Sequence, residues 1–280
     1  MTLGTRRSQV TTVLLDRALE VLPVFRLSDS ADERALQYAP ESGGRWRVLP
    51  APGDRLPGTF DQDVYVELLH RFHEADCPED GALTFTLHSF LRTMGRKADG
   101  RTYEQLRAAL SRLERTTLES TEAWFSAASG APATLSFTIL SAVVIERRRS
   151  GDREQLALFP SLTANEPGDA RVVLSPPVRA NIAAQYVTTL SWTRYQQLTS
   201  PVARRLYRLL AGLRAESGGR WRVPLDRWAE QLPLSQRYPS HLQRVLQPAH
   251  EMLVASGVVR SAAFRQEGKE WWVEYQIGRT

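Results

Sequence analysis

The polar residues between positions 240 and 247 have the spacing and chemistry of a helix that reads nucleic acid. A helix that starts at Pro239 and ends near Ala255 would carry hydroxyl, imidazole, amide and guanidinium groups on its outer face: Ser240, His241, Gln243, Arg244 and Gln247. Such groups near a helix N-terminus can bond base edges and phosphates in a major groove. Three further cations could hold the DNA backbone, at Arg237 in the preceding turn and at Arg265 and Lys269 in a predicted hairpin. A solvated helix face has a similar composition, and we favour DNA contact because the charge and the predicted fold agree with it.

A second polar face follows from a predicted helix at residues 102–115. Its candidate DNA-binding residues are Arg101, Thr102, Tyr103, Gln105 and Arg107, with Lys97 in the preceding turn and Arg112 further along the same helix. The half of the chain that contains them is slightly acidic, so contact with DNA and contact with protein are equally supported here.

Other chemistry is weakly represented. Residues 95–102 match the P-loop pattern except at one position, where Arg101 stands in place of the phosphate-binding lysine. They also follow a predicted helix, whereas a P-loop follows a strand. A group formed by His70, His73, Glu74 and Cys77 has metal-ligand spacing, but the core residue Phe72 lies among them and a structural role is favoured. We find no motif of a nicking tyrosine and no Ser/His/Asp arrangement. The sequence therefore predicts no catalytic residue, no metal and no cofactor.

Charge is distributed unevenly along the 280 residues, which carry 36 basic and 31 acidic side chains. Residues 1–184 have 22 basic and 24 acidic side chains, whereas residues 185–280 have 14 and 7, a net charge of +7. All but two of the cations are arginine, whose planar guanidinium binds phosphate and guanine in a bidentate manner that the lysine ammonium cannot match. A basic C-terminal third favours a polyanionic partner. The single cysteine and the lack of a long apolar run predict a cytoplasmic protein without a signal peptide or membrane span.

An internal repeat organises the elements that must position these residues. Apolar residues of a predicted helix after Asp61 recur at an offset of 138: Val64, Leu68, Leu69 and Phe72 match Val202, Leu206, Tyr207 and Leu210. The same offset relates Phe85, Leu87, Phe90 and Met94 to Val223, Leu225, Trp228 and Leu232. An offset of 136 relates Leu106, Ala109, Leu110 and Leu113 to Leu242, Val245, Leu246 and Ala249. Three helices and a hairpin in this order predict an α+β fold of two tandem winged helix-turn-helix domains.

The predicted boundaries follow from this repeat. Residues 1–56 are expected to form an arm outside the core, residues 57–170 the first domain, and residues 171–280 the second domain, the main reader of DNA. The duplicated octapeptide Glu-Ser-Gly-Gly-Arg-Trp-Arg-Val at 41–48 and 216–223 has a different offset, and we interpret both copies as a turn followed by a strand.

The first half resembles the plasmid replication initiator protein A family, and the second half is similar to the wider iteron-binding Rep initiators. The likeness lies in Pro57-Gly58-Thr59-Phe60-Asp61-Gln62-Asp63-Val64, Phe85-Thr86, Arg101-Thr102-Tyr103, Gln105-Leu106, Leu110 and Arg112-Leu113, then in Leu198-Thr199-Ser200, Ala203-Arg204-Arg205-Leu206-Tyr207-Arg208-Leu209-Leu210 and Arg244-Val245-Leu246-Gln247-Pro248-Ala249. The family pattern also keeps the helix continuous through Pro248, although a proline inside a helix removes a hydrogen bond.

The resemblance implies a non-enzymatic initiator that binds direct repeats in double-stranded DNA at a replication origin. It also implies recruitment of a host initiator and a replicative helicase, a homodimer held by the N-terminal domain, and repression of its own promoter. A transcriptional repressor built from the same domains is the alternative, and a nickase or ATPase is a third hypothesis that lacks its motifs.

Overall fold

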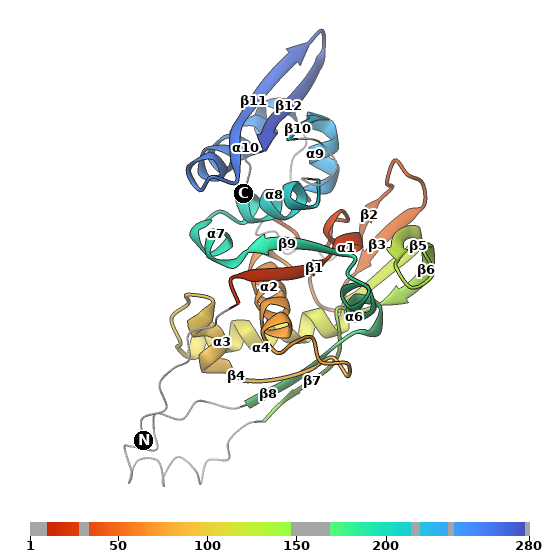
Figure 1. Cartoon of the computed structure of the whole chain (residues 1–280), viewed down its shortest axis with the longest axis vertical. Coiled ribbons are helices and arrows are strands. Elements are labelled where there is room, and N and C mark those ends of the chain that lie inside the picture. Colours follow the sequence, from red (N-terminus) through yellow and green to blue (C-terminus); the bar gives the residue numbers. More distant parts are fainter. Residues whose placement is uncertain (1–9, 28–33, 147–168, 214–218, 235–237, 278–280) are drawn as a thin grey trace.

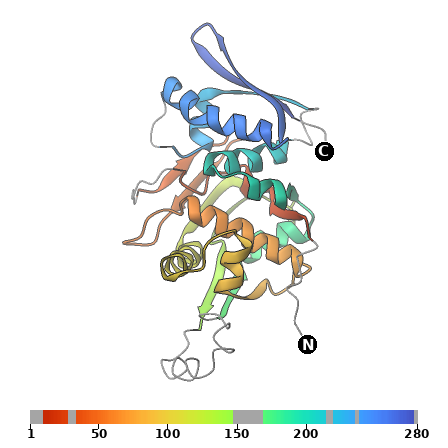
Figure 2. The same cartoon turned by 90° about the vertical axis from the view of Figure 1, so that its left-hand side faces the viewer.

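The computed structural model describes residues 10–27, 34–146, 169–213, 219–234 and 238–277, which form a mixed fold of helices and antiparallel strands (Figure 1). The α+β composition expected from the sequence is confirmed. Two structurally similar units lie one above the other along the long axis of the molecule (Figures 1 and 2). Within the described ranges, every helix is too short or too polar to cross a membrane.

The second repeat comprises six consecutive elements at the C-terminal end of the chain. They are α8 (Pro201–Leu213), β10 (Arg220–Pro224), α9 (Leu225–Gln231), α10 (Pro239–Ala255), β11 (Val259–Glu267) and β12 (Glu270–Ile277). Pro201 and Pro239 occupy the first helical positions of α8 and α10, where a proline costs no backbone hydrogen bond. Gly257 follows α10 with a φ of 70°, a conformation that glycine adopts without steric cost.

The first repeat has the same order of elements with one insertion. It comprises α2 (Thr59–Glu74), β4 (Ala82–Thr86), α3 (Leu87–Thr93), α4 (Gly100–Arg115), β7 (Leu140–Ile145) and β8 (Asp169–Leu174). Its sheet has the strand order β4-β8-β7, which corresponds strand for strand to β10-β12-β11 of the second repeat. The duplication predicted from apolar spacing is therefore present in the sheet topology as well.

The apolar positions that defined the duplication form the core of each repeat. All twelve positions of the second repeat are buried except Val245, and all twelve of the first except Met94; these two are half-buried and pack against the core. Trp228, which corresponds to Phe90, is fully buried beneath the sheet of the second repeat and contacts the ring of Tyr275. The offsets thus identified residues that occupy equivalent places in the two repeats.

The insertion in the first repeat is the hairpin of β5 (Thr117–Ser126) and β6 (Ala131–Phe137). It joins β2 (Leu36–Tyr38) and β3 (Arg45–Leu49) in a four-stranded sheet of order β2-β3-β5-β6. The first octapeptide copy forms a turn and β3, as expected, and its Trp46 is fully buried with the indole Nε1 donating to the carbonyl of Pro23 at 2.8 Å. In the second copy, residues 216–218 lie outside the described ranges, and the rest enters β10.

The N-terminal segment belongs to the core, so the expectation of an arm outside it is wrong. β1 (Thr12–Asp16) pairs antiparallel with β9 (Val187–Ser191), and α1 (Arg17–Glu20) follows it. Val13, Leu15 and Leu19 are buried between the two repeats. The partner strand lies 175 residues away in the sequence, which is why the local pattern gave no sign of this pairing.

Histidines of α2 help to hold β1 in place. The ring nitrogens of His70 and His73 lie 3.2 Å and 3.0 Å from the carbonyl oxygens of Val10 and Thr12. His70 also stacks on Trp192, with ring centroids 4.3 Å apart. These contacts give the His70–Cys77 group a structural role, and among the described residues there is no cluster of ligands that could hold a metal ion.

The first repeat ends with β8, and the segment that leads to the second repeat consists of α6 (Pro176–Ala183), β9 and α7 (Trp192–Gln197). Every residue of β8 from Asp169 to Val173 pairs with β4, and β8 also pairs with β7. The predicted boundary between residues 170 and 171 therefore cuts through a strand of the first repeat, whose sheet continues to Leu174.

Asp16 at the end of β1 gives the fold a pH-dependent element. Its buried carboxylate accepts hydrogen bonds from Ala18 N, Trp124 Nε1 and Asn181 Nδ2, at 2.9–3.0 Å. Burial nevertheless raises the pKa of this carboxyl to about 7, because the loss of hydration outweighs the three donated bonds.

We expect the stability contributed by Asp16 to be lost as the pH rises through 7. The folded state binds a proton that the unfolded chain has already released above its ordinary pKa near 4, so lowering the pH from 8 to 5.5 should raise the free energy of unfolding. Urea titrations at both pH values should show a larger gain for the wild type than for Asp16→Asn, which does not titrate. Equal gains in the two proteins would contradict a buried, protonated Asp16.

Candidate nucleic-acid interface

α10 presents most of its predicted reading residues to solvent. Leu242, Leu246 and Leu253 are buried on the side that faces α8 and α9. The outer side carries the candidates: Ser240, Arg244 and Gln247 are exposed, and His241 and Gln243 are half-exposed. Arg237, predicted to contact DNA from the preceding turn, lies outside the described residues. The helix thus brings five candidates together on one surface within its first nine residues.

Local contacts order part of this surface. The Arg244 guanidinium Nη2 lies 3.1 Å from Nδ1 of His241, and Gln247 Nε2 donates to Glu251 Oε1 at 2.8 Å. The helix remains continuous through Pro248, as expected, with that side chain exposed.

His250 anchors α10 to the sheet behind it. Its Nε2 lies 2.7 Å from the hydroxyl of Tyr275 in β12, and its ring also packs against Phe264 in β11. Burial lowers the pKa of His250 to about 4, so the imidazole is neutral at pH 7. A neutral ring can be buried without a counter-ion, and it fixes the distance between the helix and the hairpin.

The β11–β12 hairpin carries the two predicted phosphate ligands. Lys269 is exposed in the turn beside Gly268, and Arg265 is exposed on β11. Arg265 Nε lies 3.5 Å from a carboxylate oxygen of Glu274, a separation that leaves the guanidinium largely in solvent. In Figure 1 the hairpin extends beyond the rest of the second repeat, beside α10.

The corresponding face of α4 offers fewer groups than the sequence suggested. Arg101, Gln105 and Lys97 are exposed. The Thr102 hydroxyl lies 2.6 Å from the carbonyl of Lys97 and contacts Asp99, the N-cap residue of the helix. The hydroxyl of Tyr103 lies 3.2 Å from His88 Nδ1, and Arg107 pairs with Glu104 at 2.6 Å.

Two further arginines near this face differ from the sequence-based expectation. Arg112 is buried and binds Asp61 through Nη2 at 2.8 Å, so it cannot meet DNA and the expectation for it is wrong. Arg92 is exposed in the last turn of α3, next to the turn that carries Lys97, and sequence reasoning missed it. Its position directly after the buried Leu91 was the signal, because the next residue of a helix points to another side.

The glycine-rich turn between α3 and α4 is a connector. Gly95 has a φ of 69° and lies just after Met94, the C-cap residue of α3, while Asp99 accepts from the backbone of Thr102 at 3.0 Å and caps α4. A helix precedes this turn, in contrast to the strand that precedes a P-loop, which removes the structural context for a nucleotide site.

Comparison with known proteins assigns the chain to a protein family. The family model "Replication initiator protein A" matches residues 16–236. The chain belongs to this family. The resemblance expected from the sequence is confirmed, and the match spans the first repeat and the start of the second, ending before α10.

Solved structures of RctB domains are similar in fold to this chain. A crystal structure of domains 2 and 3 of RctB aligns with a TM-score of 0.53 at 13% identity, over 92% of this chain and 95% of that chain. A second structure of these RctB domains gives a TM-score of 0.51 at 12% identity, over 94% and 97%. The Pi initiator protein in complex with iteron DNA gives 0.47 at 13% identity, over 89% and 99%. No curated protein matches the chain in sequence.

The arginines of α8 that carry part of the family resemblance, Arg204, Arg205 and Arg208, face inward. Arg208 Nε binds the buried carboxylate of Glu20 at 2.6 Å, and Arg205 donates to the backbone carbonyls of Glu20 and Leu22 at 2.8 and 2.9 Å. The hydroxyl of Tyr65 donates to the same carboxylate at 3.0 Å. Glu20 thus connects α8 of the second repeat to α2 of the first.

A second cluster reinforces this junction. Asp63 of α2 accepts from Arg204 of α8, from Arg96 at 3.0 Å and from the hydroxyl of Tyr195 at 3.2 Å. The pair between Asp63 and Arg204 fixes α8 against α2. Together with Arg205 and Arg208, three arginines of the basic C-terminal third are engaged at this junction and are not surface cations.

Proposed function

We propose that this chain is a non-catalytic initiator that binds direct repeats in double-stranded DNA at the replication origin of a plasmid or secondary replicon. The observation that carries this proposal is the duplicated unit of three helices and a three-stranded sheet, whose third helix has an exposed polar face that includes arginine. Membership in the replication initiator protein A family supports the same conclusion.

Each repeat would act as a winged helix-turn-helix domain. In such a domain the third helix enters the major groove and the hairpin contacts the backbone. The second repeat of the protein would recognise the DNA sequence through α10. Arg244 can bond guanine in a bidentate manner, while Gln243 and Gln247 can bond adenine. Arg265 and Lys269 would bind phosphates and set the register of the helix.

The first repeat would make the secondary contacts. Only Lys97, Arg101 and Gln105 of its predicted residues are exposed, and Arg92 adds a fourth. Glu20 and Asp63 connect α8 of the second repeat to α2 of the first. The two DNA-binding helices, α4 and α10, would therefore meet DNA in a fixed relative orientation. Such a chain would contact two successive grooves on one side of the duplex.

Protein partners belong to the same proposal. The first repeat would hold a homodimer, and the bound initiator would recruit a host initiator and the replicative helicase. The dimer would repress the promoter of its own gene.

Footprinting on the DNA that flanks the gene tests the function. An initiator should protect several direct repeats in an A·T-rich region, with α10 facing each repeat. Protection of a single inverted repeat in the promoter would instead identify a repressor. Cleavage of DNA or hydrolysis of nucleotide by the purified protein would overturn the non-catalytic assignment.

We expect Arg244→Ala to weaken binding to the protected repeat by about 1–3 kcal/mol, or roughly 5- to 150-fold. The loss should be smaller on unrelated DNA, because base contacts supply specificity while phosphate contacts do not. Gel-shift titrations on both DNAs measure the difference. Arg115→Ala, which removes an exposed charge at the far end of α4, is the matched control. Unchanged affinity for the repeat in Arg244→Ala would show that α10 is not the reading helix.

A further inference from the structure

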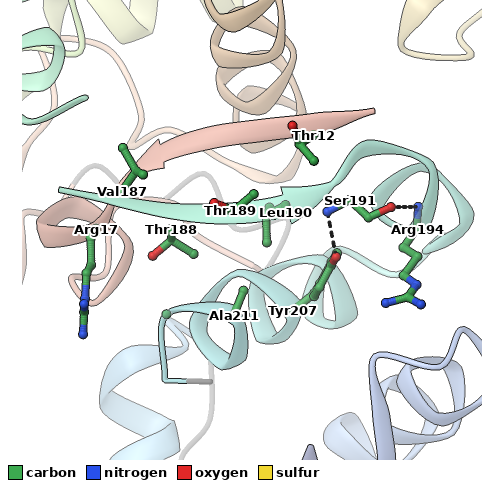
Figure 3. A pocket seen from close by; sticks show the side chains of 11 residues that line it. Thr12, Arg17, Val187, Thr188, Thr189, Leu190, Ser191, Arg194, Tyr207 and Ala211 are labelled. Atoms are coloured by element: carbon green, nitrogen blue, oxygen red, sulfur yellow. Dashed lines mark hydrogen bonds between the residues drawn. The ribbon is translucent and has the colours of Figure 1, made fainter. Parts of the chain in front are cut away.

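A groove lies between β9 and α8 at the junction of the two repeats (Figure 3). Its volume is about 440 Å³. Strand β9 forms one wall, and the C-terminal half of α8, with Tyr207, Ala211 and Gly212, forms the other. None of the residues assigned to DNA lines it.

The groove exposes an unpaired edge of β9. Trp192 N donates to Thr11 O at 2.8 Å and Arg17 N to Tyr186 O at 3.1 Å, so even-numbered residues of this strand turn their backbone groups towards β1. Val187, Thr189 and Ser191 must therefore turn theirs towards α8. Ser191 N confirms this direction, because it donates to the hydroxyl of Tyr207 in α8 at 2.9 Å.

Two residues of this edge have their backbone groups unused. The amide and carbonyl groups of Val187 and Thr189 have no hydrogen-bond partner within the described part of the chain. A row of such groups is a template for another strand. The neighbouring Thr188 is 3% exposed, and its hydroxyl also has no partner among the described residues.

Small residues of α8 form the floor of the groove. Ala211 and Gly212 line it, and a Cβ placed on Gly212 would lie only 3.3 Å from the Thr188 hydroxyl, so α8 and β9 approach each other closely there. A larger residue at position 212 would therefore crowd Thr188 and the groove beside it.

The charge of the groove selects its ligand. Two charged residues line it, Arg17 and Arg194, and no acidic residue is found among the described lining residues. Figure 3 shows the two arginines at opposite ends of β9, whose five residues span about 13 Å. One small anion cannot contact both, whereas an extended chain with an acidic group at each end can.

We propose that the open edge of β9 binds an extended, acidic peptide segment of a partner protein, which adds a third strand beside β9. The backbone of the peptide would pair with Val187 and Thr189, and its acidic ends would meet Arg17 and Arg194. The N-terminal residues of this chain are a poorer occupant, because residues 1–9 contain Arg6 and Arg7 and no acid.

A labelled model peptide tests the proposal on the full chain. The probe is a fluorescein-labelled hexapeptide, Glu-Val-Thr-Val-Thr-Glu, which is one residue longer than the five residues of β9. Fluorescence anisotropy should show saturable binding. A peptide with lysine at both ends, and one with N-methylated backbone amides, should each bind at least tenfold more weakly. The amide signals of Val187 and Thr189 should shift in NMR spectra when the acidic peptide is added.

Variants identify the groove as the site. The double variant Arg17→Ala/Arg194→Ala should lose at least tenfold in affinity, Gly212→Leu should abolish binding, and Arg115→Ala should bind as the wild type does. Circular dichroism and DNA binding check that the variants fold. No saturable binding up to 1 mM, equal binding of the lysine or N-methylated peptide, or binding of an eight-nucleotide oligothymidylate at these residues in place of the peptide would overturn the proposal. These outcomes are independent of origin binding, which rests on α10.

Discussion

Glu20→Ala is expected to lower the free energy of unfolding by about 3–5 kcal/mol, because it leaves the buried Arg208 without its counter-ion. The Glu20 carboxylate accepts from Arg208 Nε at 2.6 Å and from the Tyr65 hydroxyl at 3.0 Å. The Arg208 guanidinium also lies over the rings of Phe25 and Tyr65, at 5.4 and 5.3 Å from their centroids. Removal of the carboxylate therefore affects a cation that cannot reach water.

Urea unfolding followed by circular dichroism measures this loss. The matched control is Glu267→Ala, which breaks an ion pair with Arg222 that is 39% and 60% exposed on its two sides. An exposed pair contributes at most about 1 kcal/mol. The double variant Glu20→Leu/Arg208→Met should recover much of the loss, since an apolar pair of similar volume avoids the unpaired charge. Equal effects of Glu20→Ala and Glu267→Ala would contradict the buried junction.

The parts of the fold that sequence patterns predicted well have strong local signals. Proline at the first turn and an apolar stripe predicted α10 from Pro239 to near Ala255, and these bounds are confirmed. The apolar positions Val202, Leu206, Tyr207 and Leu210 lie in α8, as the repeat predicted. The hairpin predicted to carry Arg265 and Lys269 is present as β11 and β12. These elements depend on residues that are near neighbours in the chain.

The N-terminal segment was misjudged because its partners are distant. β1 pairs with β9, and Trp46 of β3 packs against Phe137 of β6, with ring centroids 6.3 Å apart. Periodicity within residues 1–56 contains no information on either partner. The glycines and prolines of residues 41–58 suggested an exposed arm, yet Leu56 is buried.

The candidate site was predicted better on α10 than on α4. Five of the residues expected to read DNA lie on one accessible face of α10, whereas on α4 the side chains of Thr102 and Tyr103 make contacts within the first repeat. The count of charges likewise overestimated the number of cations available at the surface. Arg204, Arg205 and Arg208 contribute to the +7 of the C-terminal third, but they pair with acids from the N-terminal part. A count of charges cannot distinguish a buried ion pair from a surface cation.

The salt dependence of DNA binding is expected to be steep despite those buried arginines. The exposed cations of the two proposed reading surfaces are Arg92, Lys97, Arg101, Arg244, Arg265 and Lys269. If the five cations other than Arg244 meet phosphates, the logarithm of the association constant should fall against the logarithm of salt concentration with a slope of about −4.5. Affinity for the protected repeat would then drop about 500-fold between 50 and 200 mM salt.

Single variants separate the two kinds of contact. Lys269→Ala should make the slope shallower by about one while the ratio of specific to nonspecific affinity stays the same, because a phosphate contact carries no sequence information. Arg115→Ala should leave both quantities unchanged, since that residue lies at the C-terminal end of α4, away from the turn that carries Lys97. Anisotropy titrations at four salt concentrations give the slopes. A flat dependence between 50 and 200 mM would contradict a nucleic-acid ligand, and a slope that Lys269→Ala does not change would exclude the tip of the β11–β12 hairpin from the interface.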